Sequence, residues 1–232
     1  LVGIADLELT VTGDVQVNRG PAAGRLDWSA VTGAGNALPD VTLALDETVE
    51  LAIHNGSAAL NVFGFVVLTV AEFDLVKQTG VAIDDSNLAA FTADVLTLSL
   101  TAGGFVGVGG SLSAANDSLA TVVTTDAVGF SVPAGSVLEL AILQDTATAS
   151  NKYTGLQGSV TNAGLVGIAD LELTVTGDVQ VNRGPAGGDR LDWSAVTGAG
   201  NALPDVTLTM DHTVELAIHN GSAALNVFGF VV

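Results

Sequence analysis

The sequence contains a long internal repeat, because residues 1–67 return at 165–232 as a near copy. The copy has one inserted residue, Asp189, and four replacements: Ala23 by Gly187, Ala44 by Thr209, Leu45 by Met210 and Glu47 by His212. Such near-identity is beyond chance and sets a period of about 164 residues. We expect a first full unit over residues 1–164 and the start of a second unit over residues 165–232.

A fainter repeat lies within the unit. Residues 5–9 resemble residues 71–75, and residues 49–53 resemble residues 138–142, in the same order. These matches predict two unequal modules, 1–70 and 71–164. Chance similarity of short segments in so biased a composition is the alternative reading.

The hydrophobic pattern is typical of β-strands. Leu7, Leu9 and Val11 alternate with acids and threonines, which predicts a strand with one apolar face. Residues 41–45 and 49–53 read as a hairpin, and the Asn-Gly pair within residues 54–57 reads as a second tight turn. Residues 56–76 are rich in valine and phenylalanine and read as one continuous strand, apolar on both faces from residue 62 to residue 71.

The predicted fold class is all-β. Strands that run through the module junctions, as at residues 65–75 and 166–175, favour an extended β-solenoid or stacked β-array in which each module covers the apolar face of the next. Tandem β-sandwich domains are the alternative, and these need polar or glycine- and proline-rich linkers between closed cores. An apolar strand left without a neighbour would indicate a subunit that assembles.

Composition excludes several classes of function. Twenty-five acidic and six basic residues give a net charge of −19, which opposes binding to nucleic acid or to an anionic membrane. A hydrophobic content of 48% argues against disorder. The chain has no cysteine, so disulfides and thiolate metal sites are impossible, and its longest apolar run reads as a strand rather than a membrane helix.

Oxygen-bearing side chains gather in predicted loops, where calcium finds its ligands. The candidate ligands are Asp84, Asp85, Asn87, Asn116 and Asp117. They match neither an EF-hand nor the glycine-rich repeat of calcium-binding β-rolls. Ordinary turn chemistry explains the same residues, since Asp and Asn also favour turns. Calcium is the one cofactor that we consider.

Catalytic chemistry has little support in the sequence. The histidines are His54, His212 and His219, and two of them precede equivalent Asn-Gly pairs, which is typical of surface turns. No serine lies in the Gly-x-Ser-x-Gly context of a nucleophile elbow. We therefore expect a protein that is not an enzyme.

Residues 56–66 and 164–175 resemble repeat units of very large, repetitive bacterial cell-surface and secreted proteins, which are adhesin-like or filament-forming. The resemblance implies export, a long parent chain and self-association with identical copies or neighbouring repeats. It points to a structural segment of an extracellular fibrous protein that provides length and stiffness by stacking β-modules. A calcium-stiffened extender of an adhesin is the alternative, and any surface glycan or host ligand is left open.

Overall fold

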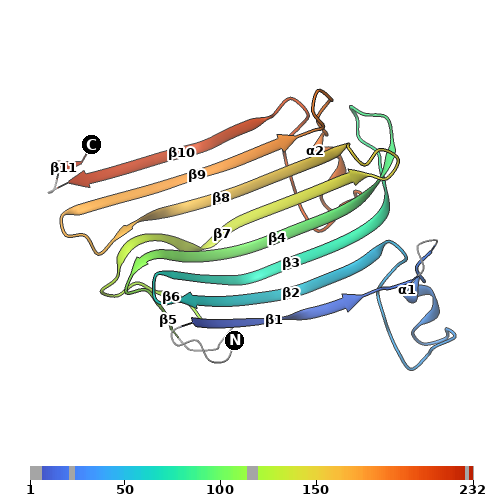
Figure 1. Ribbon diagram of the computed structural model, residues 1–232, viewed down its shortest axis with the longest axis horizontal. Helices are drawn as coiled ribbons and strands as arrows, with labels where there is room; N and C mark the ends of the chain where they lie inside the picture. Colours follow the sequence, from blue (N-terminus) through green and yellow to red (C-terminus); the bar gives the residue numbers. More distant parts are fainter. Residues whose placement is uncertain (1–6, 21–23, 114–119, 228–229, 232) are drawn as a thin grey trace.

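The computed structural model describes residues 7–20, 24–113, 120–227 and 230–231. They form an open antiparallel sheet of nine strands that lie side by side in chain order, apart from a small separate hairpin (Figure 1). The strands of the sheet are β1 (Leu7–Val17), β2 (Val49–Val62), β3 (Val66–Ile83), β4 (Phe91–Val108), β7 (Val128–Asp145), β8 (Lys152–Val166), β9 (Leu171–Arg183), β10 (Leu216–Val227) and the short β11 (Phe230–Val231). The predicted all-β class is confirmed, and the described residues form neither a solenoid coil nor two closed sandwiches.

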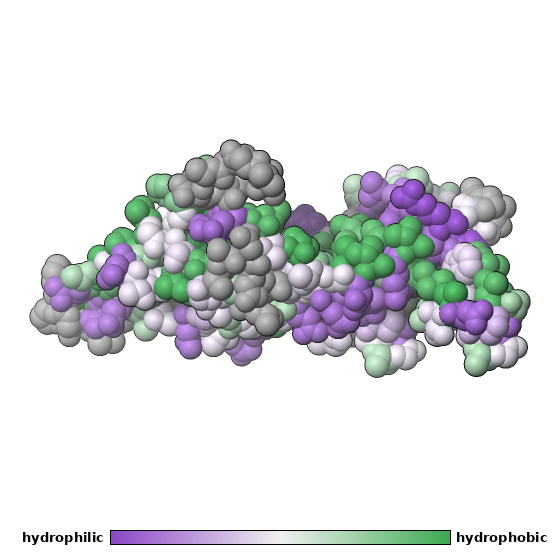
Figure 2. All heavy atoms as spheres, turned by 90° about the horizontal axis from the view of Figure 1, so that it is seen from below, coloured by the Kyte–Doolittle hydropathy of each residue, from purple (hydrophilic) through white to green (hydrophobic). Residues whose placement is uncertain are grey.

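The remaining elements lie at the two ends of the strands. The hairpin of β5 (Ser111–Leu112) and β6 (Val122–Val123) is at one end, and the one-turn helices α1 (Trp28–Val31) and α2 (Trp193–Val196) are at the other (Figure 1). Seen edge-on, the molecule is a thin slab (Figure 2). Residues 191–210 and the β5–β6 hairpin pack on the same face of it, over the buried Val95 and Phe105 of β4. The sheet therefore has one partly covered face and one open face.

The two repeat copies adopt the same pairing. Strand β1 pairs with β2 as β9 pairs with β10, and each pair shifts register at the same place. Strand β9 also pairs with β8, so the sheet runs without interruption from the first unit into the second. The predicted boundary between modules, at residues 70–71, lies inside β3 at another register shift.

The Asn-Gly pair at residues 55–56 does not form the predicted hairpin turn. It lies inside β2, where Asn55 has a φ of 51° and the pairing with both neighbours shifts register. Asn220 has the same φ at the equivalent point of β10. Asparagine and glycine tolerate left-handed backbone, which serves a β-bulge as well as a turn, and here partner strands on both sides of β2 hold the bulged form.

The prediction of one continuous strand over residues 56–76 is also wrong. Strand β2 ends at Val62 and β3 begins at Val66, with Phe63 and Gly64 in left-handed backbone at φ of 53° and 67°. Two residues with positive φ are what a tight hairpin between twisted strands requires. Residues 166–175 are split in the same way between β8 and β9. The sheet still crosses both junctions, through hairpins rather than through unbroken strands.

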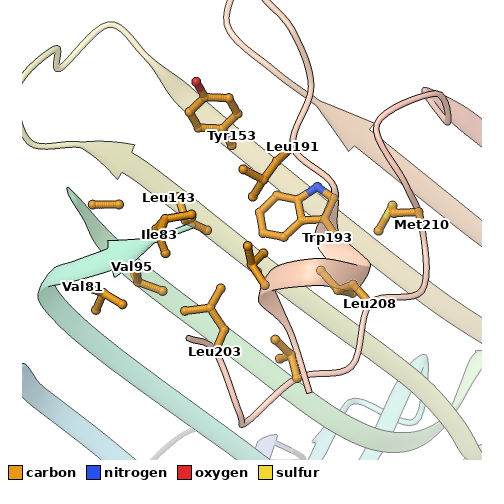
Figure 3. Close-up of a cluster of buried hydrophobic side chains, with 14 residues drawn as sticks. Val81, Ile83, Val95, Leu143, Tyr153, Leu191, Trp193, Leu203, Leu208 and Met210 are labelled. Carbon is orange, nitrogen blue, oxygen red and sulfur yellow. The ribbon is translucent and has the colours of Figure 1, made fainter. Parts of the chain in front are cut away.

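Residues 41–45, predicted as a strand, lie in the long loop 18–48 between β1 and β2. Its copy, loop 184–215, joins β9 to β10 and folds back over the sheet (Figure 3). The indole of Trp193 is fully buried there against residues of β3, β4, β7 and β8, where Val95, Leu143 and Tyr153 lie. In the second copy the segment is not a strand because its apolar side chains Val206, Leu208 and Met210 pack on the sheet face instead of pairing at an edge.

The same loop is exposed in the first copy. The large apolar side chains at 26, 38 and 41 are 48%, 46% and 48% exposed, whereas their equivalents Leu191, Leu203 and Val206 are at most 1% exposed. The sequences of the two loops are almost identical, so the difference comes from their surroundings. Loop 184–215 lies over the strands that precede β9, and loop 18–48 has no such strands before β1 among the described residues.

We predict that Trp193→Ala lowers the free energy of unfolding by about 3–5 kcal/mol, the usual cost of emptying a closed aromatic site. Trp28→Ala, the matched control, should cost only about 1–2 kcal/mol because less apolar surface is buried around Trp28. Urea unfolding followed by circular dichroism measures both values. Equal losses would contradict the difference in burial.

Candidate interaction surface

The open face of the sheet consists of rows of aliphatic side chains. Because side chains alternate between faces along a strand, directly paired residues share a face. One such row crosses all eight long strands: Val15, Ile53, Leu75, Leu98, Leu140, Leu156, Val181 and Leu216. No charged residue occurs in this row. We call this side of the sheet the aliphatic face.

Further rows on the same face are equally apolar. One contains Phe73, Leu100, Leu138, Gly158, Val179 and Ile218, and another contains Leu9, Leu60, Leu68, Gly104 and Val132. Several of these side chains face solvent, as Ile218 does at 72%. Val106, in a further row of this face with Val66 and Phe130, is 62% exposed. An exposed apolar surface of this extent marks an interaction site in a folded protein.

A shallow groove crosses the middle of the aliphatic face. It has a volume of about 430 Å³, and its lining is almost wholly apolar. Gly104 and Gly158 lie in its floor, between larger side chains of the neighbouring strands. A Cβ at Gly104 would meet nothing closer than 3.4 Å, so the hollow exists because no side chain fills it.

The opposite face has a polar row in its centre. Asp74, Ser99, Glu139, Gln157 and Gln180 are paired in turn from β3 to β9. Loop 184–215 bonds to this row. The Thr207 N–H donates to Glu139 Oε1 at 3.0 Å, and the Thr209 N–H donates to Gln157 Oε1 at 3.1 Å. Burial raises the pKa of the Glu139 carboxyl, and the hydrogen bond from Thr207 acts in the other direction.

Two of the side chains predicted to bind calcium, those of Asp85 and Asn87, bond to loop 184–215. Asp85 is buried in the turn between β3 and β4, and its carboxylate accepts hydrogen bonds from the N–H groups of Asn87, Leu88 and Asp192. Asn87 Nδ2 donates to the carbonyl of Arg190 at 3.1 Å. Asp84, the neighbouring candidate, is exposed.

Two other candidate calcium ligands, Asn116 and Asp117, lie outside the described residues. Within the described part of the chain, no group of three His, Asp or Glu side chains is arranged to hold a metal ion. Calcium binding stays a prediction.

The three histidines do not converge. His54 and His219 occupy the bulges of β2 and β10, and His212 lies in loop 184–215. His54 Nδ1 is 3.2 Å from Asp74 Oδ1 across the neighbouring strand, a contact that joins β2 to β3. His219 of β10 is paired with Asp178 of β9, and Ser159 of β8 is paired with the same Asp178 from the other side.

No protein-family model, curated protein or solved structure matches the chain. Among the described residues, no helix has the length and apolar character needed to span a bilayer. The geometry of the two faces and of the two loops is therefore the basis for assigning a function.

Removal of the Asp85 carboxylate should loosen the loop. We expect Asp85→Ala to lower the free energy of unfolding by about 2–3 kcal/mol, because several N–H groups lose a charged acceptor. Asp84→Ala, the matched control, should have little effect.

A calcium role would make the melting temperature of the wild-type protein fall on addition of a chelator, and an unchanged melt would eliminate that role.

The raised pKa of Glu139 makes stability depend on pH. A carboxyl with a raised pKa binds its proton more tightly in the folded state, so its contribution to stability improves as pH falls through that pKa and is unfavourable at neutral pH. Glu139→Gln keeps an oxygen for the Thr207 N–H and removes the charge. We expect it to stabilise the protein at pH 7, with a difference that vanishes in acid. Thermal melts between pH 3 and pH 8 would test this, and a destabilised variant at neutral pH would contradict it.

Proposed function

We propose that this chain is a structural repeat segment of an extracellular fibrous or filament-forming surface protein. In this role, successive units add strands to a single sheet and so provide length and stiffness. The observation that supports the proposal is the contrast between the two loops, one sealed on a sheet and its near-identical copy exposed. The resemblance of the repeats to those of large bacterial surface proteins supports the extracellular setting.

Successive units would stack through the same contact that loop 184–215 makes with the sheet. In the second copy, Leu191, Trp193 and Leu203 cover the face formed by β3, β4, β7 and β8 of the unit before. Leu26, Trp28 and Leu38 are the same residues in the first copy. Full burial of a side chain of this size stabilises a protein by about 1.5–3 kcal/mol, so a preceding unit would have several such contributions to gain.

The edge strands support the same arrangement. Strand β9 pairs with β8 on one side and with β10 on the other, whereas β1, its copy, pairs only with β2 among the described residues. A strand with a free row of N–H and C=O groups is a template for another strand. A copy of β8 placed against β1 would reproduce the pairing that β9 already has.

The unit geometry fixes the expected repeat length. One unit contributes six long strands to the sheet, namely β1, β2, β3, β4, β7 and β8. Neighbouring strands lie about 4.8 Å apart, so each unit should add about 29 Å along the axis of the array. A chain of several units should appear in electron micrographs as rods with this axial repeat. Globular particles alone would contradict the proposal.

Trp28 can report on stacking directly. We predict that a longer chain, in which a copy of residues 66–164 is placed before Leu1, buries Trp28 as Trp193 is buried here. With Trp193→Phe in both chains, Trp28 is the only tryptophan, and its emission should move to shorter wavelength in the longer chain. In the control, both chains instead contain Trp28→Phe, so that Trp193 is the only tryptophan. Its emission should be the same in the two chains. Equal acrylamide quenching of Trp28 in both chains would overturn the stacking model.

A further inference from the structure

The aliphatic face is not used by stacking in line, which involves only strand edges and the opposite face. We propose that this face packs against the aliphatic face of a second copy of the chain, so that two sheets form a sandwich with a shared apolar core. The observation behind this proposal is independent of the loops. It is the uncharged row from Val15 to Leu216, which crosses every long strand, together with the two apolar rows described above.

Area favours a stable contact between copies. Eight strands spaced about 4.8 Å apart span about 38 Å, and strands of 11 residues or more extend over about 36 Å. A face of roughly 1,400 Å² exceeds the area of about 800 Å² that each partner contributes to a standard protein interface. Aligned sheets of this kind pack about 10 Å apart with their side chains interdigitated.

Charge and shape also favour a second copy. The net charge of −19 would normally keep copies apart, but the rows that include Leu75, Leu98 and Leu140 have no carboxylate, so like charges do not meet at the contact. The same face has both a hollow over Gly104 and Gly158 and protruding side chains such as Val106. A surface with both features can fit its own copy, as a two-fold symmetric interface requires.

A lipid surface fits this face less well. Proteins that lie on membranes place tryptophan or tyrosine at the interface and basic residues around it. Both tryptophans and the tyrosine of this chain lie on the loop side: Trp193 and Tyr153 are in the buried cluster, and Trp28 is in loop 18–48. The chain has six basic residues against 25 acidic ones. A second copy is therefore the occupant that the chemistry favours.

Two neighbouring residues on β4 provide a matched test. Leu98 is on the aliphatic face, whereas Ser99 is on the opposite face and is paired with Asp74 and Glu139. In sedimentation velocity, we expect the wild-type chain to show a species of twice its 23.2 kDa mass. Leu98→Lys should raise the dissociation constant at least tenfold, because it buries an unpaired charge in the contact. Ser99→Lys should leave the dissociation constant unchanged.

Two further measurements make the result decisive. Val106→Lys changes a side chain that is already 62% exposed, so it should fold and should also weaken association if Leu98→Lys is too unstable to use. Val41→Glu, in loop 18–48, should disturb stacking in line and leave the face-to-face dimer intact, so the two proposals can fail separately. A monomeric wild type, equal association of the two β4 variants, or a monomer that binds phosphatidylcholine vesicles would each overturn the inference.

Discussion

Burial of one sheet face by a loop from the next unit is the interaction on which this structure depends. An antiparallel sheet one layer thick cannot enclose a core by itself, because its side chains point to two sides and both need cover or solvent. Trp193 and its neighbours provide that cover at the loop end of β3, β4, β7 and β8. At the other end, Val67 and Phe105 are buried under the β5–β6 hairpin with Ala127. The chain thus covers one face at its two ends and leaves the aliphatic face open.

The aligned bulges make such a sheet continuous across units. The pairings of the long strands shift register near their middle, including those on either side of Asn55 and Ala71 and the pairing of β10 with β9 at Asn220. If only one strand were bulged, its alternation would fall out of step with its neighbours and apolar side chains would move to the polar face. Since neighbouring strands are bulged at about the same level of the sheet, the rows of the aliphatic face stay aligned on both sides of the bulges. The repeat in sequence is therefore also a repeat in register, which is what an extensible sheet needs.

Some features of the candidate surface can be predicted from the local sequence, and others cannot. The sequence predicts Asp85 to be an oxygen ligand in a loop. In the structure its carboxylate accepts hydrogen bonds from backbone N–H groups, one of them more than 100 residues away at Asp192. No local pattern identifies a partner at that distance. The alternation of Leu7, Leu9 and Val11 predicted an apolar face for the first strand, and the aliphatic face is its continuation across the sheet. Alternation predicts that a face is apolar and does not say what covers it.

The sequence by itself determined the all-β class, the alternation of the strands and the equivalence of the two copies, because these follow from side-chain periodicity and from direct identity. Only the tertiary structure decided where strands end. Residues 62–76 turn at Phe63 and Gly64, the Asn-Gly pair at 55–56 becomes a bulge, and residues 41–45 become part of a loop. The physical reason is that a short apolar or turn-forming segment has several local conformations of similar free energy, and its neighbours in space select one of them. Two loops of nearly the same sequence, one buried and one exposed, show that selection within a single chain.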